Sequence, residues 1–232
     1  MTKIIHHTYK ADHFLISVDC IIFGFDNTGL KLLLFKRKVE PFLNEWSLIG
    51  SFIKQDESVP NAANRVLNET TGIDGVFMTE LSTYSQPQRD PGGRVISIAY
   101  YALIRLGEDE HDKVQDFQAK WFDVNEIPPL VLDHGEMIEH ALLKLKSQTK
   151  YAPVGFELLP EKFTIPQLQF LYESINQTQL DKRNFRKKIL SMRILEKLDQ
   201  KDKTSSKKGA ILYRFDPVKY KKLKSRGILF EI

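Results

Sequence analysis

Two glutamates are the residues in positions 50–73 that are best suited to chemistry. Carboxylate oxygens are hard ligands, and Mg²⁺ in proteins takes such ligands together with the phosphates of a substrate. Val66, Glu69 and Thr70 follow one another at i, i+3 and i+4, so a helix would place them on one face. Glu57 precedes that face in the chain. Three carboxylates there could hold Mg²⁺ against a diphosphate, but this face offers only Glu69.

The same stretch resembles the Nudix box, the sequence motif of a family of nucleotide hydrolases. The pattern of the box is Gly, five residues, Glu, seven residues, and then Arg-Glu-apolar-x-Glu-Glu-x-Gly-apolar. Several positions agree in register over a long spacing, which makes the resemblance specific. The matching residues are Glu57, Arg65, Leu67, Glu69, Gly72 and Ile73.

Three positions depart from the box. Ser51 stands in place of the first Gly, and Val66 and Thr70 stand in place of two Glu residues. Valine cannot ligate a metal, and threonine is a poor substitute for a carboxylate. The departures predict that the fold is kept and the hydrolysis is lost. We therefore expect no catalytic residue, no metal and no cofactor, but a pocket that binds a ligand without cleaving it.

A helix must position these residues, and the sequence marks both of its ends. Ser58 can cap the N-terminus, Pro60 suits the first turn, and Gly72 suits the C-terminal cap. Apolar residues recur at helical spacing and would form one buried face. They are Val59, Ala62, Ala63, Val66 and Leu67. Without the resemblance, this stretch would be an ordinary amphipathic helix.

Length and composition indicate a globular protein. The 232 residues suffice for one large domain or two small ones, with 42% hydrophobic and 28% charged residues. The single cysteine, Cys20, excludes an internal disulfide framework. No apolar run reaches membrane-spanning length, and residues 1–10 lack the apolar core of a signal peptide. We therefore expect a cytoplasmic protein.

Charge is distributed unevenly between the two parts of the chain. Residues 1–160 hold 16 Lys and Arg against 22 Asp and Glu, a net charge of −6. Residues 161–232 hold 18 against 8, a net charge of +10. Such an asymmetry suggests a sensing domain joined to a nucleic-acid-binding domain. The alternative is a basic, solvated tail, but the basic part also has helix and strand patterns.

The first part has the element order of an α/β fold. The order is a hairpin over residues 14–37, a strand from Trp46, the helix, strands over 78–84, 95–105 and from 119, and a helix capped by Asp133. The Nudix resemblance covers about residues 12–146 and implies an α/β/α sandwich with a mixed sheet. His134 and His140 lack a useful ligand spacing, so we predict them on the helix surface.

The second part has the pattern of a winged helix-turn-helix. Residues 151–161 are the predicted linker between a domain of residues 1–150 and one of residues 162–232. Thr164 begins a helix with a capping box, and Asp181 caps a second, basic helix. A strand pair with a charged loop would form the wing, and a basic helix ended by a glycine at position 227 would follow it.

This part, together with residues 83–104, resembles the Nudix-related transcription regulators of the NrtR and AraR kind. The resemblance implies that the second helix enters the major groove of DNA and that the wing lies near the phosphates. The predicted DNA-binding residues are Arg183, Asn184, Arg186, Lys187, Arg193, Lys207 and Lys208.

Two functions are consistent with these patterns. The first is a transcriptional repressor that binds operator DNA as a homodimer and responds to a small effector. The second is a Mg²⁺-dependent Nudix hydrolase of nucleotide sugars with an appended DNA-binding domain. The single carboxylate and the basic second part favour the first. An RNA-binding module is a third hypothesis, disfavoured by the lack of exposed aromatic residues for base stacking.

The resemblance implies two classes of effector, a pentose such as L-arabinose or else ADP-ribose. A diphosphate needs a metal or several cations, so the loss of metal ligands favours the neutral sugar. Sugar hydroxyls need polar partners and often an aromatic face. The candidate ligand-binding residues are Trp46, Ser51, Glu57, Glu69, Gln86 and Arg94.

Overall fold

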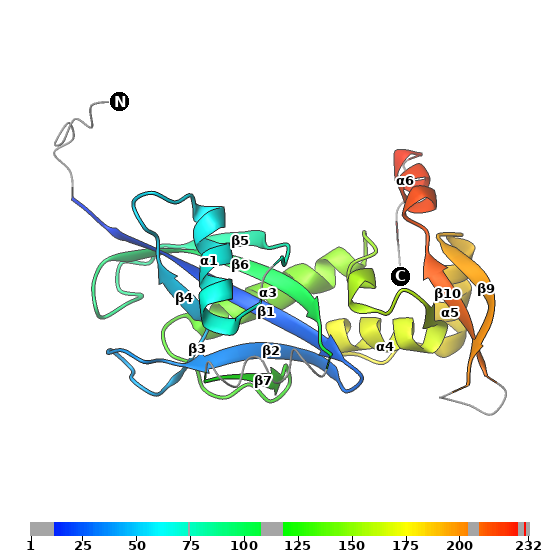
Figure 1. Cartoon of the computed structure of the whole chain (residues 1–232), viewed down its shortest axis with the longest axis horizontal. Helices are drawn as coiled ribbons and strands as arrows, with labels where there is room; N and C mark the ends of the chain where they lie inside the picture. The colour runs from blue at the N-terminus through cyan, green and yellow to red at the C-terminus, as the bar shows by residue number, and fades with distance from the viewer. Residues whose placement is uncertain (1–11, 74, 108–117, 204–208, 227–229, 231–232) are drawn as a thin grey trace.

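The computed structural model describes residues 12–73, 75–107, 118–203, 209–226 and 230. Two parts lie along its long axis, an α/β part toward the N-terminus and a smaller part toward the C-terminus (Figure 1). No helix among these residues is both long enough and apolar enough to cross a membrane.

The first part is built on a seven-stranded mixed sheet. Its main path has the order β3-β2-β1-β6-β5, with β4 paired to β1 and β7 paired to β2. Only the pairing of β1 with β6 is parallel among the described strands. The strands are β1 (Leu15–Asp26), β2 (Gly29–Lys36), β3 (Trp46–Ser47), β4 (Ile49–Phe52), β5 (Thr79–Tyr84), β6 (Val95–Arg105) and β7 (Ala119–Asp123).

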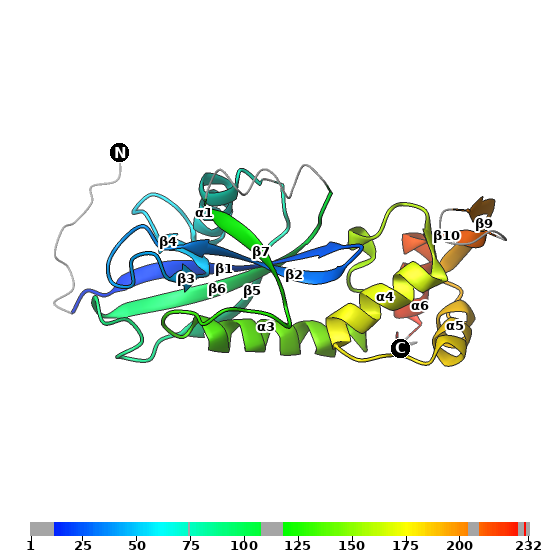
Figure 2. The same cartoon turned by 90° about the horizontal axis from the view of Figure 1, so that it is seen from below.

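One helix covers each face of this sheet. Helix α1 (Val59–Thr71) lies on one side and α3 (His134–Thr149) on the other (Figure 2). The predicted ends of α1 are confirmed, because the Ser58 side chain accepts a hydrogen bond from the Asn61 backbone and Gly72 adopts a left-handed conformation at φ 68°. The predicted α/β/α sandwich with a mixed sheet is confirmed as well.

Strand alternation separates two apolar clusters. Ile22 and Tyr100 belong to the cluster on the α1 side, and Ile21 and Tyr101 belong to the cluster on the α3 side. The α3-side cluster continues without a break into the second part of the chain. The two parts therefore share one apolar core.

The second part is a winged helix. It comprises α4 (Ile165–Asn176), α5 (Lys182–Ser191), α6 (Pro217–Ser225) and a sheet in the order β8-β10-β9. Its strands are β8 (Phe163–Thr164), β9 (Leu195–Asp202) and β10 (Ala210–Phe215). The predicted capping box of Thr164 and the Asp181 cap are both present. Helix α6 ends at Ser225, and the glycine predicted to end it, at position 227, lies outside the described residues.

The predicted linker is packed rather than extended. It contains a short 3-10 helix, η2 (Phe156–Leu158), and the side chains of Phe156, Leu158 and Leu159 are buried in the shared core. Gly155 precedes η2 at φ 83°, a conformation that favours glycine. The connection is thus part of the interface between the sandwich and the winged helix.

Candidate functional site

The charged residues of the Nudix box are bound to one another. Arg65 donates to Glu57 at 2.6 and 2.8 Å, to Glu69 at 3.0 Å, and to the carbonyl of Phe52 at 3.1 Å. The hydrogen bonds from Arg65, followed by one from the Lys54 backbone, lower the pKa of Glu57 to about 2. Arg65 therefore fastens the preceding loop to helix α1.

The side of α1 that carries Val66 and Thr70 is largely closed. Val66 is only 2% exposed and packs in the α1-side cluster, which confirms its predicted place on the buried apolar face of the helix. The Thr70 hydroxyl donates to the Val66 carbonyl, so it is engaged within the helix. Glu69 remains exposed but is paired with Arg65 and lies 3.8 Å from Lys54 Nζ. The described residues contain no group of three or more acidic, His or Cys side chains able to hold a metal ion.

The candidate ligand-binding residues do not form one pocket. Ser51 of β4 pairs with Val18 of β1, and the Val18 side chain packs on the α1 side of the sheet. Glu57 and Glu69 also lie on that side. The side chain of Trp46 is elsewhere, against Phe122 of β7 with 4.8 Å between ring centroids.

Gln86 and Arg94 form a third group in the loop between β5 and β6. Arg94 donates to the carbonyls of Ser85 and Gln86 at 2.9 and 3.3 Å, which closes the base of this loop. The six candidates thus lie at three places on the sandwich, and which of them contact a ligand stays a prediction.

A pocket of about 710 Å³ lies between this loop and α3. Gln86 is the only one of the six candidates that lines it. Tyr84 and His140 form one wall, with 3.0 Å between the Tyr84 hydroxyl and His140 Nδ1. Burial, followed by the nearby charges of Glu136 and Asp133, raises the pKa of Tyr84 to about 12. Most of the described residues that line the pocket are polar, and the one arginine among them, Arg89, is paired with Asp133.

A buried ion pair beneath this pocket was missed by sequence reasoning. Arg89 is 9% exposed and donates to both carboxylate oxygens of Asp133 at 2.6 and 2.8 Å. Burial opposes the charge of Arg89, but the bonds and charge of Asp133 outweigh it and raise the arginine pKa. Asp133 occupies the N-cap position of α3 but makes no side-chain capping bond there, which corrects the prediction. The sequence signal for Arg89 is its place in residues 86–94, a loop with two prolines and two glycines.

His134 corrects a second prediction, because it is buried rather than on the helix surface. Its ring is 2% exposed, and Nδ1 accepts a hydrogen bond from the Leu48 backbone at 3.1 Å. Asp19 lies 3.7 Å from the other ring nitrogen and accepts a hydrogen bond from Ser97. Burial lowers the pKa of His134, so the neutral ring serves as a structural acceptor. His140 is exposed, as predicted.

Helix α5 presents a cationic surface. Phe185 and Ile189 point into the core, whereas the predicted DNA-binding residues of the helix are exposed. Those residues are Arg183, Asn184, Arg186 and Lys187. Arg193 follows α5 and is also exposed, while Lys207 and Lys208 lie outside the described residues. Their roles in DNA binding stay predictions.

The turn before α5 is braced by α4. Glu173 accepts a hydrogen bond from the Leu180 backbone at 2.9 Å, and Gln169 donates to the Leu180 carbonyl at 2.9 Å. These bonds join the end of α4 to the start of the basic helix. Movement of α4 would therefore carry α5 with it.

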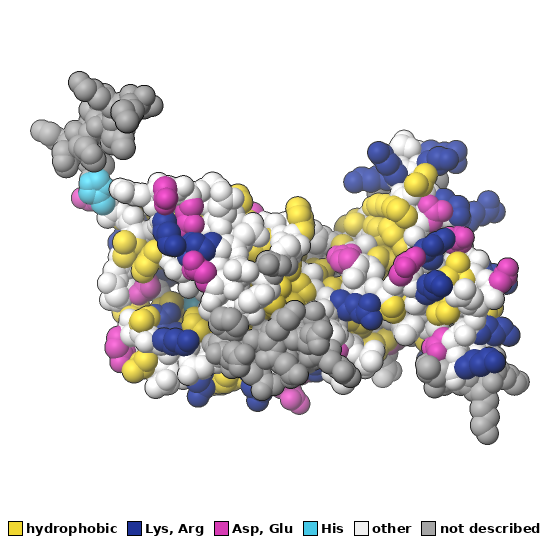
Figure 3. All heavy atoms as spheres, in the orientation of Figure 1, with side chains coloured by type: hydrophobic (Ala, Val, Ile, Leu, Met, Phe, Trp, Pro, Cys, Tyr) yellow, Lys and Arg dark blue, Asp and Glu magenta, His cyan; other side chains and the backbone are white. Residues whose placement is uncertain are grey.

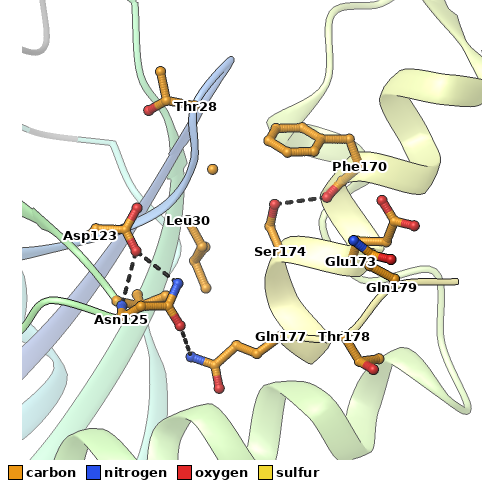
Figure 4. A pocket seen from close by; sticks show the side chains of 12 residues that line it. Thr28, Leu30, Asp123, Asn125, Phe170, Glu173, Ser174, Gln177, Thr178 and Gln179 are labelled. Carbon is orange, nitrogen blue, oxygen red and sulfur yellow. Dashed lines mark hydrogen bonds between the residues drawn. The ribbon is translucent and has the colours of Figure 1, made fainter.

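The end of α4 also contacts the sandwich, at a pocket of about 440 Å³ (Figure 4). Gln177 donates to Asn125 beyond β7 at 3.2 Å and accepts a bond from Lys146 of α3 at 2.5 Å. Phe25 of β1 and Phe170 of α4 add a ring contact at 5.8 Å. Gln177 thus connects two elements of the sandwich to the turn that positions α5.

Comparison with known protein families identifies both parts. A model described as the NUDIX domain matches residues 13–141, more than half of the chain. The chain belongs to the NUDIX family. A second model, the NrtR DNA-binding winged helix domain, matches residues 155–215. The resemblance stated from sequence is thereby confirmed for both parts of this NUDIX-family protein.

Two relatives with established names match this chain. The ADPR responsive transcriptional repressor NtrR of Acinetobacter baylyi is 32% identical over 205 residues, covering 87% of this chain and 82% of the relative. The ADP-ribose pyrophosphatase of Methanocaldococcus jannaschii is 38% identical over 128 residues, covering 55% of this chain and 72% of the relative.

A solved structure matches nearly the whole length. The crystal structure of Shewanella oneidensis NrtR complexed with a 27mer DNA is 28% identical with a TM-score of 0.74, and the match covers 89% of this chain and 95% of that chain. The arrangement of sandwich and winged helix is therefore shared with that protein.

Proposed function

We propose that this protein is a DNA-binding transcriptional repressor whose NUDIX domain binds a small effector without hydrolysing it. The observation that carries the proposal is the contrast within one chain: α1 offers a single exposed, paired carboxylate, whereas α5 exposes its basic residues. The match to the Acinetobacter repressor over most of both chains supports the same function.

The proposed effector is ADP-ribose. Loss of two carboxylates favoured a neutral sugar in the sequence reasoning, but it also removes two negative charges that would repel a diphosphate in the absence of metal. Lys54 and Arg65 lie beside the remaining Glu69. The names of both relatives refer to ADP-ribose, and neither name refers to a pentose.

Binding of the effector would reach the DNA through the contact at the end of α4. Gln177 holds Asn125 and Lys146 of the sandwich, and Glu173 and Gln169 brace the turn before α5. In a homodimer on a pseudo-palindromic site, a small rotation there would change the distance between the two α5 helices, which must match the half-site spacing.

The test begins with a thermal-shift comparison of ADP-ribose and L-arabinose. A ligand at 100 times its dissociation constant stabilises the folded state by about 2.7 kcal/mol, so ADP-ribose should raise the melting temperature and arabinose should not. A duplex selected from a random pool by binding is then titrated with and without ADP-ribose. We expect its affinity to fall about 5–150-fold, the usual range of allosteric coupling.

Each arm of this test can overturn a different statement. A shift with arabinose alone would replace the effector, and equal DNA affinities in the two titrations would remove the regulatory role. The remaining alternative is a Mg²⁺-dependent hydrolase, kept because the NUDIX family contains the pyrophosphatase relative. Turnover of ADP-ribose with Mg²⁺ at roughly 1–1000 per second would establish an enzyme instead.

A further inference from the structure

Helix α6 has no role in the proposed function so far. It follows the residues 155–215 that match the winged helix family, and it buries none of its side chains. Tyr220 and Leu223 reach the core with partial burial only. Short helices are marginal in water without apolar contacts, so these two residues hold α6 to the core and the rest of its surface faces solvent.

Most of the exposed residues between positions 217 and 226 are cations. They are Lys219, Lys221, Lys222, Lys224 and the following Arg226. The acid at the start of the helix, Asp216, caps it and pairs with Lys219 at 3.0 Å. Within the described part of the chain, the other four cations form no ion pair. Figure 3 shows Lys and Arg side chains around this end of the molecule.

Helix stabilisation explains only part of this charge. Cations in the last turn, Lys222 and Lys224, interact favourably with the helix dipole. Lys219 and Lys221 lie too early for that effect. Lys219, Lys222 and Arg226 also recur at i, i+3 and i+7, so like charges share one side of the helix and repel. A polyanion bound along this side would turn that repulsion into attraction.

The position of α6 suits the backbone of duplex DNA. Strand β10 ends at Phe215 and α6 begins at Pro217, so the helix lies at the end of this six-residue strand (Figure 1). At about 3.3 Å per residue, six residues span about 20 Å. Phosphates of one DNA strand recur about every 3.4 Å of helix axis, so this span along the axis corresponds to roughly six nucleotides.

We propose that α6 is a second phosphate-backbone contact for duplex DNA, beyond the contact made by α5. The proposal rests on the DNA-binding function inferred above. It assigns α6 to affinity and not to sequence readout, because lysines act on phosphates as point charges.

The experiment compares two triple variants that remove equal charge. The first carries Lys219→Gln, Lys222→Gln and Arg226→Gln, the three cations on one side of α6. The control carries Lys38→Gln, Lys144→Gln and Lys150→Gln, which are exposed lysines of the sandwich without a charged partner in the described structure. Binding of a random-sequence 30-base-pair duplex is measured by fluorescence anisotropy at several salt concentrations, and circular dichroism checks folding.

The readout is the slope of log affinity against log salt, to which each phosphate contact adds about 0.9. The α6 variant should lose up to about 2.7 from the slope, and the control should keep that of the wild type. An unchanged slope in the α6 variant, or an equal loss in the control, would overturn the proposal and leave α6 to another partner. A wild-type protein that binds no DNA would instead contradict the proposed function itself.

Discussion

Helices α1 and α5 are both capped and amphipathic, but they use their charges in opposite ways. In α1 the side chain of Arg65 is 17% exposed, and its guanidinium is bound to two carboxylates and a carbonyl. In α5 the basic side chains are exposed, and within the described residues they form no ion pair. Charges satisfied within the chain stabilise local structure, whereas charges left without a partner are available to another molecule.

The largest expected effect would come from forcing a charge onto the closed side of α1. Val66→Glu should lower the free energy of unfolding by about 3–5 kcal/mol, the usual cost of a buried charge without a partner. Urea denaturation measures this loss. Thr70→Glu is the control, because that position is partly exposed and the change there should be small. A fully stable Val66→Glu variant that gains Mg²⁺ affinity by calorimetry would show that the face is open.

Removing one arginine from each helix tests the contrast directly. Arg186→Ala should weaken binding to a selected duplex by about 1–3 kcal/mol if the guanidinium contacts a base in bidentate fashion. Its effect on unfolding should stay within about 0.5 kcal/mol, because the side chain is exposed.

The matching change, Arg65→Ala, should give the reverse result. It should lower the melting temperature by freeing the loop before α1, and it should leave the affinity for DNA without effector unchanged. Fluorescence anisotropy gives the DNA affinity of each variant, and thermal denaturation gives its melting temperature. If Arg65→Ala and Arg186→Ala lost the same DNA affinity, the charges of α1 and α5 would not have the separate roles described above.

A smaller effect is expected at the contact that joins the two regions. Gln177→Gly removes the bonds to Asn125 and Lys146 while suiting the left-handed backbone at φ 53°. The variant should bind DNA normally but lose most of the effect of ADP-ribose on that affinity. Asn125→Ala should act in the same direction, and the double variant should add little more. If ADP-ribose still changed the DNA affinity of both variants fully, the signal would have to pass between the two domains by another contact.

The smallest effect is the pH dependence of the α1 ion pair. Hydrogen bonds from Arg65 hold the pKa of Glu57 near 2, below its ordinary value of 4.5. A depressed carboxyl pKa contributes stability that is complete above about pH 4.5 and is lost as the pH falls toward 2. The difference in melting temperature between wild type and Glu57→Gln should shrink across that range. A constant difference would mean that Glu57 titrates normally.

The sequence alone determined the local structure and the division of charge. The caps of α1, α4 and α5 depend on residues within a few positions of one another, such as Ser58 with Asn61 and Thr164 with Gln167. Hydrophobic periodicity is likewise local, so the strands and helices could be predicted. The Nudix box was recognisable because its pattern lies in one continuous stretch.

Tertiary structure alone decided which polar residues meet. Arg89 and Asp133 are 44 positions apart, and Leu48 and His134 are 86 apart, so no local pattern could join them. Their pairing depends on how the loop, the sheet and α3 pack, because burial forces polar groups to find partners wherever the fold places them. The same packing dispersed the candidate ligand residues and brought the end of α4 against the sandwich.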